Sequence, residues 1–206
     1  GSRLITSGPD YDRVLQVGRR IAQTSDSPNL AWEFKLIDEP KTVNAFCLPG
    51  GKVAVYTGIL PITQNEAGLA VVVAHEIAHA IARHGSERMT DQLALQVGQV
   101  GLAELLGGKS EQTRNLVLAA FGAGAQVGVL LPFSRSQESE ADHIGLVYMA
   151  RAGYDPREAP GFWRRMAEQS SGSRSPEFLS THPAPGDRIR RIEAVIPEAM
   201  LEYRPR

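Results

Sequence analysis

Residues 71–84 read VVVAHEIAHAIARH, an apolar helical segment interrupted by the pattern His-Glu-x-x-His. At about 100° per residue, His75 and His79 lie on one face of a helix, one turn apart, so both imidazole rings reach one metal ion. Glu76 is rotated about 100° from His75 and lies beside that ion, where zinc peptidases place the carboxylate that takes a proton from water. The pattern therefore predicts two zinc ligands and a general base on one short helical segment.

The residues around this pattern predict that its helix is central. Residues 69–74 and 77–82 are almost all apolar, so no wide polar face is left for solvent. A surface helix with two solvated histidines is the alternative, and this composition disfavours it. We expect the helix to begin at an N-cap, Thr63, and to end with His84 in front of Gly85.

A catalytic zinc site needs a third protein ligand and keeps its fourth position for water. Residues 134–145 offer one, because Glu138 and Asp142 are four residues apart and share a helical face. Glu138 is then a candidate ligand, and Asp142 is a candidate acceptor for the free ring N–H of a ligand histidine. Glu140 falls on the opposite side, although an unusual helix register would reverse this assignment.

Several motifs resemble, in the same order, a known family of zinc metallopeptidases that includes the CAAX prenyl endopeptidase, the heat-shock protease HtpX and quality-control relatives. The motifs are Asn44-Ala45-Phe46, Pro49-Gly50-Gly51, HEIAH at residues 75–79, ESEAD at residues 138–142, and Thr181-His182-Pro183 followed by Arg188-Ile189. The resemblance implies a gluzincin endopeptidase, a soluble bacterial member, with one Zn²⁺ per chain held by His75, His79 and Glu138.

The resemblance also implies roles for residues outside the metal motifs. His182 matches the family position that stabilises the oxyanion, and Arg188 resembles its usual companion, so both are expected to be catalytic. Residues 44–46 are expected to form a strand that lines the cleft and binds a polypeptide substrate as an extended, added strand.

The other periodicities predict an α+β domain that is mainly helical. Four further segments show helical patterns: residues 10–24, 134–152, 155–169 and 185–196. Residues 31–37 alternate like a half-buried strand, and a hairpin is expected across Pro49-Gly50-Gly51. A small sheet, with one edge along the cleft, is therefore expected to pack against the central metal helix.

Residues 86–133 are expected to form a helical insertion between the metal motifs. Its two helices, residues 91–106 and 113–131, are a candidate lid over the active site. Residues 115–134 carry no charge, but their glycines make them only moderately apolar, which favours packing on the domain over a membrane span. Peripheral association with a membrane stays open.

The composition sets few limits on partners and location. The 206 residues, 42% of them hydrophobic, suffice for one domain over residues 1–206. A net charge of −1 gives no basic surface for nucleic acid, and the single Cys47 leaves no internal disulfide. The resemblance includes periplasmic quality-control relatives, so we expect a bacterial periplasm or cell-envelope location. Gly1-Ser2 resembles a cloning remnant, so the export signal is expected to be missing from this sequence. The oligomeric state is not predicted.

These features predict zinc-dependent cleavage of internal peptide bonds in unfolded or misfolded polypeptides, as part of protein quality control. Three alternatives stay open. One is a zinc-binding chaperone, although structural zinc sites usually close all four positions with Cys or His. The second is a zinc hydrolase of another substrate class, such as an exopeptidase. The third is a latent protease in which His182 blocks the metal.

Overall fold

The structure, a computed structural model, describes residues 3–108, 110–113, 115, 117, 133–170, 176–184 and 186–205. Its elements, in chain order, are β1 (Arg3–Ile5), α1 (Pro9–Thr24), β2 (Glu33–Asp38), β3 (Ala45–Leu48), β4 (Lys52–Tyr56), a 3-10 turn η1 (Thr57–Ile59), α2 (Leu60–Thr63), α3 (Glu66–Ile81), α4 (His84–Leu105), α6 (Arg135–Arg151), α7 (Glu158–Ser170), α8 (Glu177–Thr181) and α9 (Arg188–Leu201). Most of the described residues are helical, and the predicted α+β class, mainly α, is confirmed.

The four strands form one sheet in the order β1-β2-β4-β3. β2 and β4 run parallel, whereas β1 pairs with β2, and β3 with β4, in antiparallel register. The β3–β4 hairpin turns at Gly50 and Gly51, whose φ angles of 90° and 86° favour glycine. The predicted hairpin is therefore confirmed, and β3 is an edge strand of the described sheet.

Helix α1 packs beside the sheet. It begins with Pro9, whose fixed φ suits a first helical turn, and Asp10 and Asp12 lie at the positive end of the helix dipole. Gly18 allows α1 to approach β2 closely, because a Cβ atom at this position would lie 2.3 Å from the Phe34 ring.

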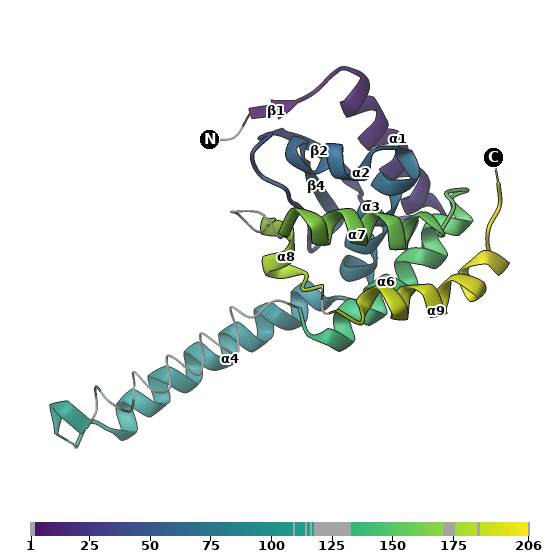
Figure 1. The fold of residues 1–206 in the computed structure, drawn as a ribbon. Helices are drawn as coiled ribbons and strands as arrows, with labels where there is room; N and C mark the ends of the chain where they lie inside the picture. The colour runs from purple at the N-terminus through teal and green to yellow at the C-terminus, as the bar shows by residue number, and fades with distance from the viewer. Residues whose placement is uncertain are drawn as a thin grey trace.

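Helix α3 occupies the centre of the fold (Figure 1). It packs against α1, α6, α7 and β3, and residues 68–79 are all buried, as their composition predicted. Asn65 caps its N-terminus by accepting a hydrogen bond from the Gly68 N–H at 2.8 Å. The predicted cap at Thr63 is wrong, because Thr63 ends α2, where its hydroxyl donates to the Leu60 carbonyl.

Helix α6 lies against α3 and carries the second acidic motif. Ser134 and Gln137 form a capping box at its start, so the predicted cap at Ser134 is confirmed. The two helices are close at Gly145, where an added Cβ would lie 3.1 Å from the backbone nitrogen of His75. This close contact holds the acidic face of α6 beside the metal motif of α3.

Helix α4 projects away from the rest of the fold (teal, Figure 1). It begins at His84 rather than near residue 91, so the first predicted insertion helix is longer than expected. The second one, residues 113–131, lies largely outside the described residues, as does the uncharged stretch 115–134. A lid over the active site stays a prediction. Within the described ranges, each helix is too short or too polar to cross a lipid bilayer.

Candidate active site and metal centre

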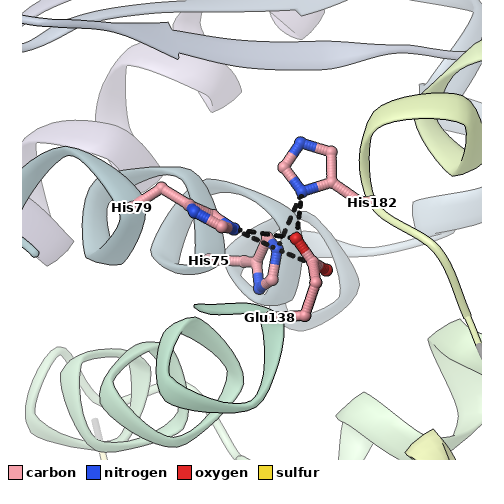
Figure 2. A group of neighbouring side chains, drawn as sticks. All are labelled: His75, His79, Glu138 and His182. Carbon is pink, nitrogen blue, oxygen red and sulfur yellow. Dashed lines mark hydrogen bonds and ion pairs between the residues drawn. The ribbon is translucent and has the colours of Figure 1, made fainter. Parts of the chain in front are cut away.

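Four buried side chains converge from α3, α6 and the residue after α8 (Figure 2). They are His75, His79, Glu138 and His182, and their ligand atoms all lie within 4.8 Å of one another. Each residue is at most 3% exposed. The structure thus brings together the three predicted zinc ligands and adds His182 to the same group of donors.

The donor atoms face one another at short distances. The Nε2 atoms of His75 and His79 are 3.0 Å apart. Glu138 Oε1 lies 3.1 Å from His79 Nε2 and 2.9 Å from His182 Nδ1, and Glu138 Oε2 lies 3.5 Å from His75 Nε2. The i, i+4 spacing on α3 produces the first of these contacts. The packing of α6 on α3 brings Glu138 to both histidines, and the residue after α8 adds His182.

This set of donors fits a divalent metal. Three imidazole nitrogens and one carboxylate oxygen are ligands that zinc takes in proteins. Burial alone would raise the pKa of Glu138, but His75 and His182 hold it well below its ordinary value, so the carboxylate is ionised. An ionised carboxylate among buried imidazoles is the form in which these side chains bind a metal.

Glu76 lies beside the donor group without joining it, where its helical rotation predicted. It is 2% exposed, and its Oε1 is 3.4 Å from His182 Nε2. Burial raises the pKa of Glu76, partly opposed by the charges of His182 and His75. A carboxyl group of raised pKa is suited both to accept a proton and to return it.

Asp142 and Arg188 lie behind His75. Asp142 Oδ1 is 3.0 Å from His75 Nδ1, so the predicted acceptor for a ligand histidine lies beside His75. Arg188 donates to both oxygens of Asp142, from Nη2 at 2.7 Å and from Nε at 2.8 Å. These contacts fix the orientation of the His75 ring.

Arg188 lies behind the donor group, and its role as the catalytic companion of His182 stays a prediction. Its Nη1 lies 2.7 Å from Glu138 Oε2, and its guanidinium group stacks 3.5 Å from the centre of the Trp163 ring. It is not among the residues that line the cleft. The geometry favours a role in positioning the carboxylates of Glu138 and Asp142.

His84 contacts the metal motif, which the sequence did not indicate. Helix α3 ends at Ile81, and Arg83 adopts a left-handed φ of 60°, so the interpretation of His84 as the end of the metal helix is wrong. The turn brings His84 back to His79, with 2.9 Å between their Nδ1 atoms. A left-handed conformation at a residue other than glycine has little sequence signal, so the sequence did not reveal this contact.

A cleft of about 290 Å³ is lined by Glu76, His79 and His182. Residues 46–49, at the end of the edge strand β3 and in its turn, also line it. Further lining residues are Arg83, then Gly85, Ser86 and Arg88 at the start of α4, and Phe133, which precedes α6.

Residues 44–46 are only partly in the place predicted for substrate binding. Phe46 lines the cleft, whereas Asn44 and Ala45 are buried at 9% and 0% exposure. The Ala45 N–H donates to Asn44 Oδ1 at 2.9 Å, so this edge donor already has a partner. The strand that borders the cleft is displaced along the chain, toward Cys47 and Leu48.

A helix with His-Glu-x-x-His, a glutamate donor from a second helix and a buried carboxyl group at a strand-edged cleft define a gluzincin-type metallohydrolase site. The chain belongs to peptidase family M48, whose profile matches residues 10–196. The family resemblance predicted from the motifs is thus confirmed.

Relatives of known name agree with this assignment. The chain is 42% identical over 204 residues to the mitochondrial metalloendopeptidase OMA1 of Schizosaccharomyces pombe, covering 98% of this chain and 58% of the relative. It is 38% identical over 185 residues to the mitochondrial metalloendopeptidase OMA1 of Arabidopsis thaliana, covering 89% and 36%. It is 36% identical over 189 residues to the beta-barrel assembly-enhancing protease of Yersinia pestis, covering 87% and 38%.

The comparisons also correct one expectation. The predicted location in the bacterial periplasm or cell envelope is contradicted, because the relatives from Schizosaccharomyces pombe and Arabidopsis thaliana are named as mitochondrial proteins. The chain spans between 36% and 58% of the length of the three relatives.

Proposed function

We propose that this chain is the catalytic domain of a zinc-dependent endopeptidase that cleaves unfolded or misfolded polypeptides in protein quality control. The observation that carries the proposal is the buried group of His75, His79 and Glu138, with Glu76 beside it at the cleft. Membership of family M48 and the names of the relatives support the same activity.

The side chains at the site divide the chemistry of peptide hydrolysis among them. Zinc, when bound by His75, His79 and Glu138, would act as a Lewis acid that polarises the scissile carbonyl and lowers the pKa of water. Glu76 accepts a proton and returns it to the leaving amine, and its raised pKa suits both steps. His182 directs Nε2 toward Glu76 and is assigned to donate a hydrogen bond to the oxyanion.

The edge of β3 supports binding of an extended polypeptide. The Tyr56 N–H donates to the Asn44 carbonyl, so the alternation of an antiparallel pair turns the backbone groups of Ala45 and Cys47 away from β4. Because the Ala45 N–H is donated to Asn44 and Ala45 is fully buried, the outward carbonyl of Cys47, at the cleft, is left to pair with an added strand. Such pairing needs no free terminus, which favours internal cleavage.

Glu76→Gln tests the chemistry. It is expected to lower casein cleavage at least about 100-fold while one zinc per chain is retained, since Glu76 handles the proton and is not a ligand. The control is Glu33→Gln, a half-exposed glutamate on β2, which should cleave like the wild type. Substantial cleavage by Glu76→Gln, or wild-type cleavage that survives zinc removal by a chelator, would refute the proposal.

A head-to-tail cyclic peptide separates endopeptidase from exopeptidase activity. An enzyme that pairs with the backbone should open the ring as fast, within a few fold, as it cleaves the linear peptide of the same sequence. Mass spectrometry of the products identifies the bond. Cleavage of the linear peptide alone, one residue at a time, would assign the site to an exopeptidase.

A latent protease is a second candidate, favoured by the place of His182 in the donor group, 2.9 Å from Glu138 Oε1. His182→Ala distinguishes the two roles. Loss of an oxyanion donor should lower turnover about 100- to 1,000-fold. Loss of a blocking ligand should instead raise turnover, with zinc still held by the other three side chains.

A further inference from the structure

The ring of His79 has an uncommon partner on the side away from the donor group. Ligand histidines generally give their second ring nitrogen to a carboxylate, a backbone carbonyl or water. Here His79 Nδ1 lies 2.9 Å from Nδ1 of another imidazole, His84, which is 2% exposed. His84 Nε2 in turn lies 3.3 Å from Oε2 of Glu140, whose side chain is 56% exposed. The three side chains form a chain of contacts from the donor group to the surface.

Only one arrangement of protons suits both hydrogen bonds and a metal at His79 Nε2. A metal takes the lone pair of Nε2, so the neutral His79 ring must carry its proton on Nδ1. That N–H needs an acceptor, so His84 Nδ1 must be unprotonated. His84 then carries its proton on Nε2, where the carboxylate of Glu140 accepts it. The opposite tautomers would point a proton from His79 Nε2 into the donor group.

We propose that His84 is a positioning residue, which holds His79 as the Nδ1–H tautomer and so presents Nε2 to a divalent metal, with Glu140 orienting His84. The inference rests on the proposed metal site and adds a residue to it. The left-handed turn at Arg83 makes the contact, because on an unbroken helix His84 would be rotated about 140° from His79.

The alternative is that His84 only fills space between α3 and Phe133, whose ring centroid is 6.3 Å away. Two substitutions separate filling space from accepting a hydrogen bond. His84→Leu keeps an apolar side chain of comparable size and removes the acceptor. His84→Asn loses volume but keeps an oxygen close to the position of Nδ1. A space-filling role predicts that Leu is the better replacement, and a positioning role predicts that Asn is.

Zinc affinity, measured by competition with a chromophoric chelator, is the first readout. His84→Leu is expected to weaken zinc binding about 10- to 100-fold, and His84→Asn to restore it to within about threefold of wild type. His143→Leu is the matched control, because His143 also pairs with a glutamate, Glu198 at 2.9 Å, but lies half-exposed on α6 away from the donor group. It should bind zinc like wild type.

The second readout is the ring tautomer of His84 in the zinc-loaded protein, because in the metal-free protein the Glu138 carboxylate, 3.1 Å from His79 Nε2, can also accept a proton from that atom. Long-range ¹H–¹⁵N spectra of the histidine rings should show His84 as the Nε2–H tautomer, with its unprotonated Nδ1 facing the Nδ1–H of His79. The thermal midpoint of each metal-free variant shows whether it is folded.

The outcomes separate this inference from the proposed function. Failure of the wild type to bind zinc would overturn the proposed function and the positioning role together. If the wild type binds zinc, three results would overturn the positioning role alone: wild-type zinc affinity in His84→Leu, poorer binding by His84→Asn than by His84→Leu, or an Nδ1–H tautomer of His84 in the zinc-loaded protein.

Discussion

The two histidines of the metal motif meet in one donor group but are supported by different surroundings. Behind His75 lie full charges in the interior: Asp142, 11% exposed, and Arg188, 1% exposed. Behind His79 lies a neutral ring, His84, followed by a glutamate at the surface. The Asp142–Arg188 pair behind His75 is enclosed by packing, whereas the contact of His84 with Glu140 behind His79 reaches the solvent.

The proton affinities of the two rings follow this difference. Burial alone would lower the pKa of His75, but Glu138 and Asp142 raise it to about 9. Burial also lowers the pKa of His79, and with His75 and His182 nearby it stays well below its ordinary value. The charged partners of His75 therefore compensate one another, and removing one of them is costly. The partner of His79 instead orients its ring through a hydrogen bond. The predictions below test this contrast.

The largest effect is expected from Arg188→Gln. This change leaves the buried carboxylates of Glu138 and Asp142 without their cation, and breaking a buried pair in this way costs about 3–5 kcal/mol. Urea unfolding in the presence of a chelator measures the loss in the free energy of unfolding. Arg164→Gln is the control, because its 2.6 Å pair with Glu193 is about half-exposed and contributes about 0–1 kcal/mol. Equal losses in the two variants would contradict the contrast.

Glu138→Gln and Glu140→Gln compare the two glutamates of α6. The amide in Glu138→Gln would keep the shape of a ligand but not its charge, so zinc affinity is expected to fall more than about 100-fold, beyond the loss typical of an outer partner. Glu140→Gln preserves an acceptor for His84 and should stay within about threefold of wild type. Equilibrium dialysis measures both. Tight, stoichiometric zinc in Glu138→Gln would place the third ligand elsewhere.

The parts of the site that the sequence predicted depend on local periodicity. The i, i+4 pairs His75–His79 and Glu138–Asp142 are fixed by helical geometry alone, once each segment is known to be a helix. The hairpin follows in the same way from Gly50 and its neighbours between two apolar runs. Local pattern therefore placed the ligands on the correct helical faces.

The parts that the sequence missed depend on contacts between elements or on single backbone conformations. His84 reaches His79 only because Arg83 is left-handed, and Gly85 had suggested a simple helix end. The sequence indicated Arg188 but not its buried partners, which come from α6 and α7. Propensity alone favours Asn65 over Thr63 as the cap of α3, but the prediction followed Glu66, which stands three residues after Thr63 as in a capping box.

Asp142→Asn is expected to act on the His75 side alone. It removes the charge that faces His75 Nδ1 and pairs with Arg188, and loss of such an outer partner costs about 10- to 100-fold in metal affinity. Chelator competition gives the affinity, and histidine spectra of the metal-free protein should show a change at His75 but not at His79. A loss of less than about threefold would show that the charge behind His75 is dispensable.

The smallest expected effect comes from the backbone contact beneath His75. In a helix, Gly→Ala alone gains about 1 kcal/mol. At Gly145 the new methyl group would lie 3.1 Å from the backbone of Ala74 and His75, which cannot turn aside as a side chain can, and such overpacking costs about 1–3 kcal/mol. Gly145→Ala should therefore be neutral or destabilising by up to about 2 kcal/mol, and zinc affinity should fall a few fold, because α6 is pushed away from His75. Gly161→Ala is the control, since its methyl group would meet only the ends of two long side chains, Arg165 at 3.3 Å and Glu158 at 3.8 Å, so a gain in stability and unchanged zinc binding are expected. If Gly145→Ala gains as much stability as Gly161→Ala and binds zinc as tightly as wild type, the close approach of α6 does not position His75, and the contrast between the two histidines rests on their side-chain partners alone.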